Sequence, residues 1–160
     1  MINAFISIKP KYVGMLLRGE KSIEIRSRAV NLAPGSRLWI YSTLPKGCLE
    51  AVANVQSVKI DSPDVIWKHY HKKINISRDA FLSYVNGSQK VSAILLEDVR
   101  RVVPSLTLGD LRFEIRCFHP PQFLKHIETA SPFFKLLRTK RVKFIYWGHG
   151  VRATVSGLEL

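Results

Sequence analysis

The hydrophobic pattern of the first 60 residues alternates between short apolar runs and one helical stretch. Residues 4–8 (Ala-Phe-Ile-Ser-Ile) form an apolar, β-branched run, which predicts a buried strand. A helix is expected next, because Pro10 suits a first helical turn and Gly19 suits a helix end. Three further strands are predicted over residues 22–26, 37–42 and 49–58, between turns rich in glycine and proline.

The middle of the chain changes to helical spacing. Ser62-Pro63-Asp64 combines an N-cap residue, a proline for the first turn and an early acid, which predicts a helix. Ser77 caps a second predicted helix that ends near residues 86–87. Residues 91–103 are rich in Val, Ile and Leu and predict a strand that stops at Pro104.

The last third predicts mostly helices. A capping box, Thr107-x-x-Asp110, opens a short helix. The turn at 119–123 is expected to lead into another helix, Ser131-Pro132 into a third, and residues 142–147 into a closing strand. The order of elements favours a small α+β chain, a compact barrel that carries helices. A P-loop is excluded, because GxxxxGK(S/T) is absent, and no GxGxxG follows a strand to indicate a dinucleotide-binding unit.

The chain is strongly basic. Lys and Arg number 25 against 12 Asp and Glu, so the formal charge is +13, which favours an acidic partner: RNA, DNA or an anionic membrane. The basic residues gather in segments 1–40, 68–90 and 111–147, which could converge on one face or form separate solvated faces.

Other features of the sequence narrow the possible classes of protein. No secretory signal pattern and no apolar stretch near the ~20 residues of a membrane span is visible, so we expect a soluble cytoplasmic protein without a membrane partner. Two distant cysteines do not predict a disulfide framework. His69-x-His71 lies between lysines and lacks a third ligand, so no metal and no cofactor is predicted.

The segment Gly19-Glu20-Lys21-Ser22-Ile23-Glu24-Ile25-Arg26 carries the most specific chemistry. In a strand, Ser22, Glu24 and Arg26 share one face while the two isoleucines face the core. A lysine, a carboxylate and a guanidinium presented together suit recognition of phosphate or a nucleobase, and also acid–base chemistry if they are shielded from water. The plain alternative is a surface strand with an ordinary Glu24–Arg26 ion pair.

Gly19, Lys21, Glu24 and Arg26 stand at the spacing GxKxxExR, which resembles the signature of the ASCH domain family. That family belongs to the PUA-like β-barrel superfamily. The segments before and after the motif agree with it, clearly over residues 4–60 and further through residue 103.

The resemblance implies a PUA-like barrel of five to six mixed strands with helical insertions and a helical C-terminal extension. Residues 1–104 would form the barrel core and residues 105–160 an extension packed on the same domain. It also implies a link to RNA, because members of the family and its relatives bind RNA, recognise modified bases or cleave RNA.

One branch of the family removes the acetyl group of N4-acetylcytidine. Lys21 matches its catalytic lysine, but Glu24 stands where that branch has a nucleophilic threonine, and a carboxylate is not an equivalent nucleophile. RNA-cleaving members use a motif lysine with tyrosine or serine residues elsewhere. Lys9, Tyr41 and Ser42 are the nearest counterparts in type.

The leading hypothesis is an RNA-binding module that holds RNA or a nucleobase in a cleft beside the motif. The residues expected to bind are listed here: Lys9, Lys21, Ser22, Glu24, Arg26, Tyr41 and Ser42. The alternative is an RNA-processing enzyme, a ribonuclease or a nucleoside amidohydrolase, with Lys21 and Glu24 catalytic. A third class is a regulatory module that senses a nucleotide. The oligomeric state does not follow from the sequence.

Overall fold

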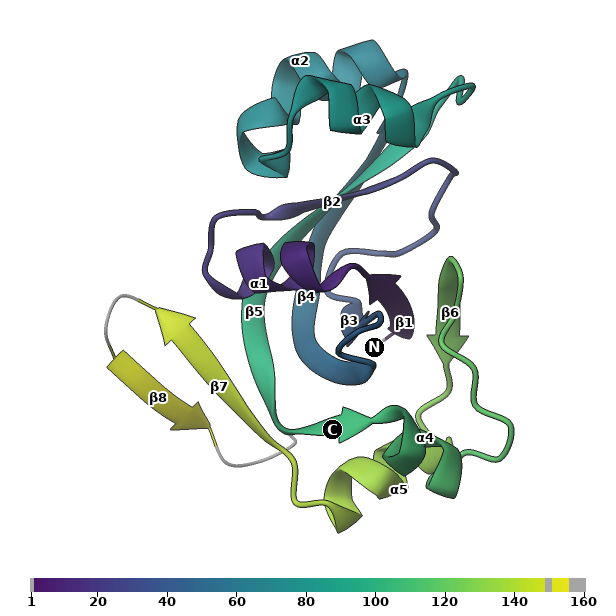
Figure 1. Cartoon of the computed structure of the whole chain (residues 1–160), viewed down its shortest axis with the longest axis vertical. Coiled ribbons are helices and arrows are strands. Elements are labelled where there is room, and N and C mark those ends of the chain that lie inside the picture. Colours follow the sequence, from purple (N-terminus) through teal and green to yellow (C-terminus); the bar gives the residue numbers. More distant parts are fainter. Residues whose placement is uncertain (1, 149–150, 156–160) are drawn as a thin grey trace.

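A computed structural model describes residues 2–148 and 151–155. Strands and helices are interspersed along the chain, as Figure 1 shows. The strands are β1 (Asn3–Ile8), β2 (Ile23–Arg26), β3 (Arg37–Ser42), β4 (Cys48–Asp61), β5 (Val91–Thr107), β6 (Leu124–Ile127), β7 (Lys143–Gly148) and β8 (Val151–Val155). The helices are α1 (Pro10–Leu17), α2 (Pro63–Ile74), α3 (Arg78–Val85), α4 (Leu108–Glu114) and α5 (Pro132–Thr139).

The strands form one curled sheet in the order β6-β1-β3-β4-β5-β7-β8, and β2 pairs separately with β5. β1 and β3 are parallel, and the other pairs are antiparallel. This architecture confirms the predicted mixed α+β fold with helices, and the sheet curls into a half-barrel. Eight strands lie in the described residues instead of five to six, because the chain after β5 contributes β6, β7 and β8 as well as helices.

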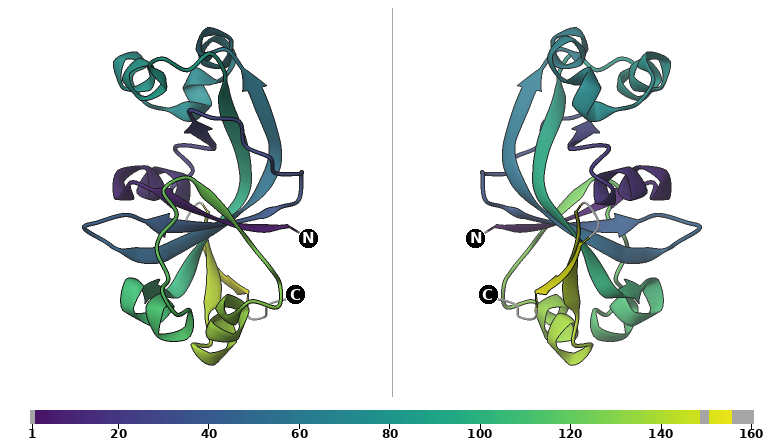
Figure 2. Two further views of the ribbon diagram at one scale, coloured as in Figure 1. Left: turned by 90° about the vertical axis from the view of Figure 1, so that its right-hand side faces the viewer. Right: turned by 90° about the vertical axis from the view of Figure 1, so that its left-hand side faces the viewer.

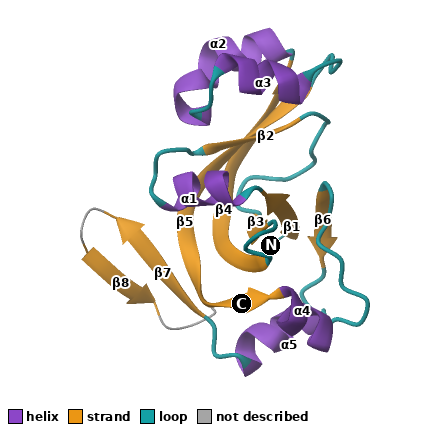
Figure 3. Cartoon of the chain, in the orientation of Figure 1, coloured by secondary structure: helices purple, strands orange, loops and turns teal. Residues whose placement is uncertain are grey.

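The long strands β4 and β5 set the overall shape. They span 14 and 17 residues and pair along most of their length, with three shifts of register at which they bend. Their far end carries α2 and α3 away from the rest of the sheet, as Figure 2 shows from the side. Figure 3 shows the helices at separate places, with α2 and α3 at one end, α4 and α5 at the other, and α1 between them.

Two predicted elements were wrong. Residues 124–127 are a strand, not part of a helix, because their backbone pairs with the free edge of β1. The strand predicted to stop at Pro104 continues to Thr107. It can do so because Pro104 lies where the pairing of β5 with β4 is interrupted, so its missing N–H breaks no bond of that ladder. β5 therefore crosses residue 104 without a break, and a division of the chain there stays a prediction.

The helix starts agree with the local signals. The side chain of Ser62 accepts a hydrogen bond from the backbone of Val65, and that of Ser77 accepts one from Ala80. Thr107 and Asp110 form the predicted capping box. No helix in the described ranges, 2–148 and 151–155, is long and apolar enough to cross a membrane.

The hydrophobic core has three parts. One lies between α1 and the sheet, around Ile6 and Leu16. A second surrounds Trp39 and Phe133, so α5 covers that face of β3. A third lies beneath α2 and α3, around Phe81. Between the first and third parts, the chain of β2 passes from α1 toward α3, and this is where the motif residues lie.

Candidate functional site

The turn after α1 holds Lys21 in a fixed position. Gly19 has a φ of 72°, a left-handed conformation that glycine adopts without strain and that ends the helix. The backbone N–H groups of Glu20 and Lys21 donate to the Met15 carbonyl. The Asn75 side chain, just beyond α2, donates to the Glu20 carbonyl at 2.7 Å. The turn is therefore attached to two helices, one on each side of it in space.

β2 places the next two motif residues. Glu24 pairs with Ile94 of β5, and Arg26 pairs with Ser92. Ile23 and Ile25 belong to the core beneath α2 and α3. The strand alternation that the sequence predicts thus leaves the carboxylate and the guanidinium on the side that faces the cleft described below.

Lys21 is almost completely buried, with 3% of its surface exposed. Its Nζ donates a hydrogen bond to the Ile74 carbonyl at 3.0 Å and lies 3.8 Å from Oε2 of Glu24. It also lies 5.7 Å from the centre of the Tyr12 ring. Burial lowers the pKa of Lys21, the Glu24 charge opposes that shift, and Arg26 adds to it. At a given pH, the neutral amine form of Lys21 is therefore more populated than that of an ordinary lysine.

Arg26 is buried beside the same carboxylate. Its Nη2 lies 3.3 Å from Oε1 of Glu24 and donates to the Ser7 carbonyl at 2.7 Å. Its Nε is buried and has no hydrogen-bond partner among the described residues, and the same holds for Oγ of Ser7. One carboxylate thus lies between two cations, so the cluster has a net charge of +1 and keeps unused hydrogen-bonding groups, which suits an anion.

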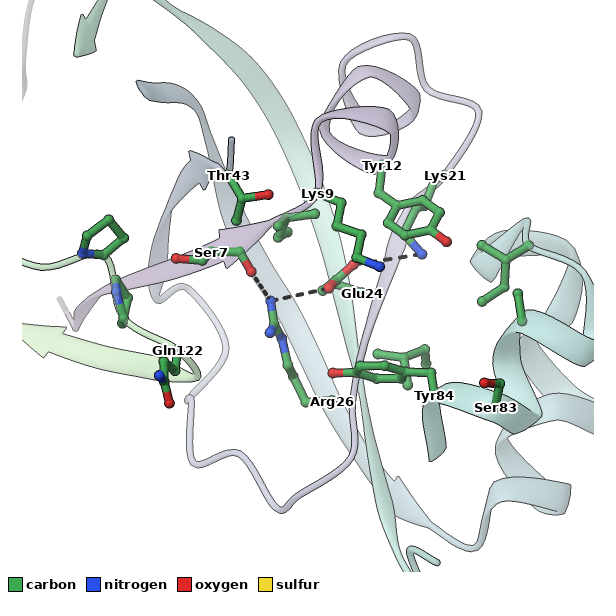
Figure 4. A pocket seen from close by; sticks show the side chains of 16 residues that line it. Ser7, Lys9, Tyr12, Lys21, Glu24, Arg26, Thr43, Ser83, Tyr84 and Gln122 are labelled. Carbon is green, nitrogen blue, oxygen red and sulfur yellow. Dashed lines mark hydrogen bonds and ion pairs between the residues drawn. The ribbon is translucent and has the colours of Figure 1, made fainter. Parts of the chain in front are cut away.

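A cleft of about 720 Å³ lies over this cluster. It is lined by Ser7, Ile8, Lys9, Tyr12, Lys21, Glu24, Ile25, Arg26, Thr43, Ile76, Ala80, Ser83, Tyr84, Pro120, Pro121 and Gln122. Figure 4 shows the three buried charged residues together, with Tyr12, Tyr84 and Gln122 around them on separate segments of the chain. The volume is in the range of clefts that bind small molecules or single building blocks of a polymer.

The structure brings four of the predicted site residues together: Lys9, Lys21, Glu24 and Arg26 line the cleft. Ser22 is half-buried in the motif turn and is not part of the lining.

Tyr41 and Ser42 lie elsewhere. Tyr41 is buried in the core around Trp39, and Ser42 is fully buried. β3 pairs with β1 so that Ser42 lies opposite Ile8, and the next residue, Thr43, reaches the cleft instead.

Sequence reasoning missed the walls of the cleft. Nothing in the local sequence pattern marks Ser7 or Tyr12 as a cleft residue. The prolines before β6 also face the cleft. The helical spacing of α3 is the one sequence signal for Tyr84. Phe81 and Val85 form the buried face of this helix, and Tyr84 lies outside that face. No group of three or more metal-ligating side chains occurs in the part of the chain that the structure describes.

A family described as a domain of unknown function (DUF365) matches residues 4–109. An ASCH domain-containing ribonuclease of Zymomonas mobilis subsp. mobilis is 31% identical over 123 residues, which are 76% of this chain and 82% of that protein. The chain belongs to the ASCH domain family. The resemblance seen in the GxKxxExR motif is thereby confirmed.

Solved structures agree with this assignment. The crystal structure of ASCH from Zymomonas mobilis has a TM-score of 0.79 at 26% identity, and the match covers 85% of this chain and 94% of that one. The N-terminal domain of Staphylothermus marinus McrB has a TM-score of 0.56 at 12% identity, covering 86% and 93% of the two chains, which shows a shared fold alone. The fold that carries the cleft is therefore shared by several proteins.

Proposed function

We propose that this ASCH protein is a ribonuclease that binds and cleaves RNA in the cleft over Lys21, Glu24 and Arg26. The observation that carries the proposal is the buried cluster of these three residues at the base of an open cleft. The similarity to a protein named as a ribonuclease, over most of both chains, supports the enzymatic hypothesis over the binding module that the sequence favoured.

Cleavage of RNA through its 2′-hydroxyl needs a group that moves a proton and a group that stabilises the charge growing on the phosphate. In this proposal the neutral amine of Lys21 takes the proton of the 2′-hydroxyl, and its lowered pKa makes that neutral form available. The 2′-oxygen then bonds to the phosphorus while the bond from phosphorus to the 5′-oxygen breaks, and the leaving 5′-oxygen takes a proton from the Lys21 ammonium or from water. Arg26 stabilises the phosphate charge, because a guanidinium donates several N–H bonds to phosphate oxygens and this one keeps a buried N–H without a partner among the described residues.

Glu24 has a positioning role in this proposal. Its two oxygens face Lys21 and Arg26 separately, so it orients both cations. A carboxylate held in this way is a poor nucleophile, and Ser22 does not line the cleft. These two features favour a ribonuclease over an amidohydrolase of the N4-acetylcytidine type.

The test is cleavage of a fluorescently labelled single-stranded RNA by the wild-type protein, the Lys21→Met variant and the Lys90→Met variant. Lys90 is exposed and lies outside the cleft lining, so it is the matched control. We expect Lys21→Met to lower kcat by about 100-fold or more with RNA affinity changed only a few-fold, and Lys90→Met to resemble wild type.

Two outcomes would overturn the proposal. Tight RNA binding by the wild type without any product would identify an RNA-binding module, the hypothesis that its charge of +13 also supports. Equal product formation by wild type and Lys21→Met would remove Lys21 from the chemistry.

A further inference from the structure

A group of polar side chains spans four neighbouring strands outside the cleft, and we call it the arginine-pair cluster. Four of its members stand two positions along their strands from a residue of the core around Trp39, so they continue that face of the sheet beyond its apolar part. None of the members lines the cleft. They are Arg37 of β3, Asn54 of β4, Asp98 and Arg100 of β5, and Tyr146 of β7.

A bulge in β5 positions the carboxylate of this cluster. The pairing of β4 with β5 shifts here, so that Asp98 and Val99 together lie opposite one residue of β4. Asp98 has a φ of 54°, a left-handed conformation that few residues other than glycine, asparagine and aspartate adopt. Its Oδ2 accepts a hydrogen bond from Nδ2 of Asn54 at 3.1 Å and lies 3.2 Å from Nη2 of Arg100. The bulge thus fixes one carboxylate beside Arg100.

The guanidinium of Arg100 is held on several sides. Its side chain is 13% exposed, and its central carbon lies 5.5 Å from the ring centres of both Phe144 and Tyr146. A hydrogen bond to Asp98 raises the pKa of the Tyr146 hydroxyl, so the tyrosine joins the same network. Nε of Arg100 is buried and has no hydrogen-bond partner among the described residues. Arg100 is therefore fixed in place with one N–H unused.

Arg37 lies near this network without a counter-ion of its own. It is half-buried, and its side chain forms no ion pair or hydrogen bond within residues 2–148 and 151–155. Burial lowers the pKa of Arg37 and the Arg100 charge lowers it further, while Asp98 opposes the shift. Two arginines thus share one carboxylate, so the cluster has a net charge of +1. A half-buried cation without an anion costs free energy.

We propose that the arginine-pair cluster is a binding site for an oxyanion of the phosphate class, held between Arg37 and Arg100. A guanidinium binds phosphate through two parallel N–H bonds, and two guanidinium groups can bind different oxygens of one phosphate. Such an oxyanion would supply the counter-charge that Arg37 lacks and would accept bonds from both arginines.

The proposed oxyanion site is separate from the cleft. Arg37 is the first residue of β3, whereas the cleft residue Thr43 follows the last residue of that strand. At the rise of a strand the two positions are about 20 Å apart. The proposal therefore goes beyond the proposed function and does not depend on it.

The test follows the Nε–H signals of the arginine side chains by proton–nitrogen NMR at constant ionic strength. Inorganic phosphate is the first probe. A 2′-O-methyl oligonucleotide, which cannot be cleaved through its 2′ oxygens, is the second. Arg37→Met and Arg100→Met assign the two signals, and Arg138→Met, at an exposed residue of α5, is the matched control. The signal of Arg26 reports on the cleft separately.

We expect a probe to shift the signals of Arg37 and Arg100 along one saturating curve. Arg37→Met should weaken the binding seen at Arg100 by about tenfold or more, while Arg138→Met stays within about twofold of wild type. Saturation with inorganic phosphate identifies a free phosphate or a phosphate monoester as the ligand. Saturation with the oligonucleotide alone identifies the phosphodiester of a nucleic acid.

Asp98→Asn should bind the probe about fivefold more tightly than wild type. It removes the carboxylate that competes with the oxyanion, and asparagine tolerates the left-handed backbone at this position. Damage to the fold would weaken binding instead, so a gain in affinity distinguishes a binding site from a cluster that only stabilises the sheet.

The proposal fails if neither probe shifts the two signals with saturation, or if Asp98→Asn binds no more tightly than wild type. It also fails if phosphate shifts the Arg26 signal alone, since the phosphate would then be bound in the cleft. The proposed function fails separately, by absence of cleavage of ordinary RNA, whatever these signals do.

Discussion

The ammonium group of Lys21 donates a 3.0 Å hydrogen bond to the carbonyl oxygen of Ile74, a residue 53 positions further along the chain. Ile74 is the last residue of α2, where unpaired carbonyls carry partial negative charge. The bond therefore favours the protonated lysine, against the effect of burial. It also makes α2 part of the site, although no residue of that helix lines the cleft.

Asn75 offers a test of this attachment. Its side chain donates to the Glu20 carbonyl, and its backbone is left-handed with a φ of 51°. Asn75→Gly tolerates that backbone and removes only the side-chain bond, so we expect a loss of about 1 kcal/mol in the free energy of unfolding. We also expect kcat on RNA to fall several-fold with KM nearly unchanged, because Lys21 is held less firmly.

Urea unfolding and steady-state cleavage measure these two effects. Asn75→Ala is the companion variant, because it adds about 1–2 kcal/mol of backbone strain to the same lost bond. If kcat of Asn75→Gly equals that of wild type, the bond from Asn75 to the Glu20 carbonyl has no role in catalysis.

Neutralising Glu24 should move the titration of Lys21. The Glu24 charge raises the pKa of Lys21, so Glu24→Gln lowers that pKa further while the repulsion by Arg26 remains. The limb of the pH profile of kcat/KM that belongs to Lys21 should therefore shift to lower pH. Glu24→Asp keeps the charge and should keep the limb close to its wild-type position.

The profiles are compared below the melting temperature of each variant, because breaking a buried ion pair costs about 3 kcal/mol. A limb at the same pH in wild type and Glu24→Gln would mean that Lys21 does not titrate in the reaction.

Burial of Lys21 also predicts how stability depends on pH. Its pKa in the folded protein lies below its ordinary value of 10.5, so between these two values the unfolded chain binds the proton more tightly. Stability should therefore rise as pH increases through this window and level off above 10.5. Lys21→Met lacks this contribution. The unfolding free energy of the wild type minus that of the variant should therefore increase as the pH rises through this window. A constant difference across the window would contradict the lowered pKa.

Asp110 makes a separate prediction at acid pH. Bonds from Lys140 and Thr107 lower its pKa from 3.8 to about 2. Its carboxylate thus stabilises the fold above pH 3.8 and loses this effect as the pH falls toward 2. Asp110→Asn should cost about 1 kcal/mol near neutral pH, the usual value of a helix cap, and almost nothing near pH 2.

Thermal or urea unfolding at several pH values measures the effect of Asp110→Asn. Asp64→Asn is a suitable control, since Asp64 is an exposed acid in the first turn of α2 without an ion pair among the described residues. Curves for Asp110→Asn and wild type that stay parallel down to pH 2 would refute the role of this carboxylate.

Local signals predicted most of the secondary structure. Caps such as Ser62 and Ser77 fix helix starts through bonds within four residues, so neighbouring sequence is enough to reveal them. The two errors, at residues 124–127 and at Pro104, have the opposite cause. Both depend on strand pairing, which joins residues far apart in sequence and cannot be recognised from the local pattern.

The same division applies to the site. The sequence by itself determined the family and the charged motif, because Lys21, Glu24 and Arg26 are neighbours whose spacing on a turn and strand places them together. Only the tertiary structure decided that these charges are buried, that Ile74 holds the lysine and that Tyr84 forms a wall of the cleft. Those features come from the packing of α2 and α3 against β2, and such contacts between distant segments depend on the whole fold.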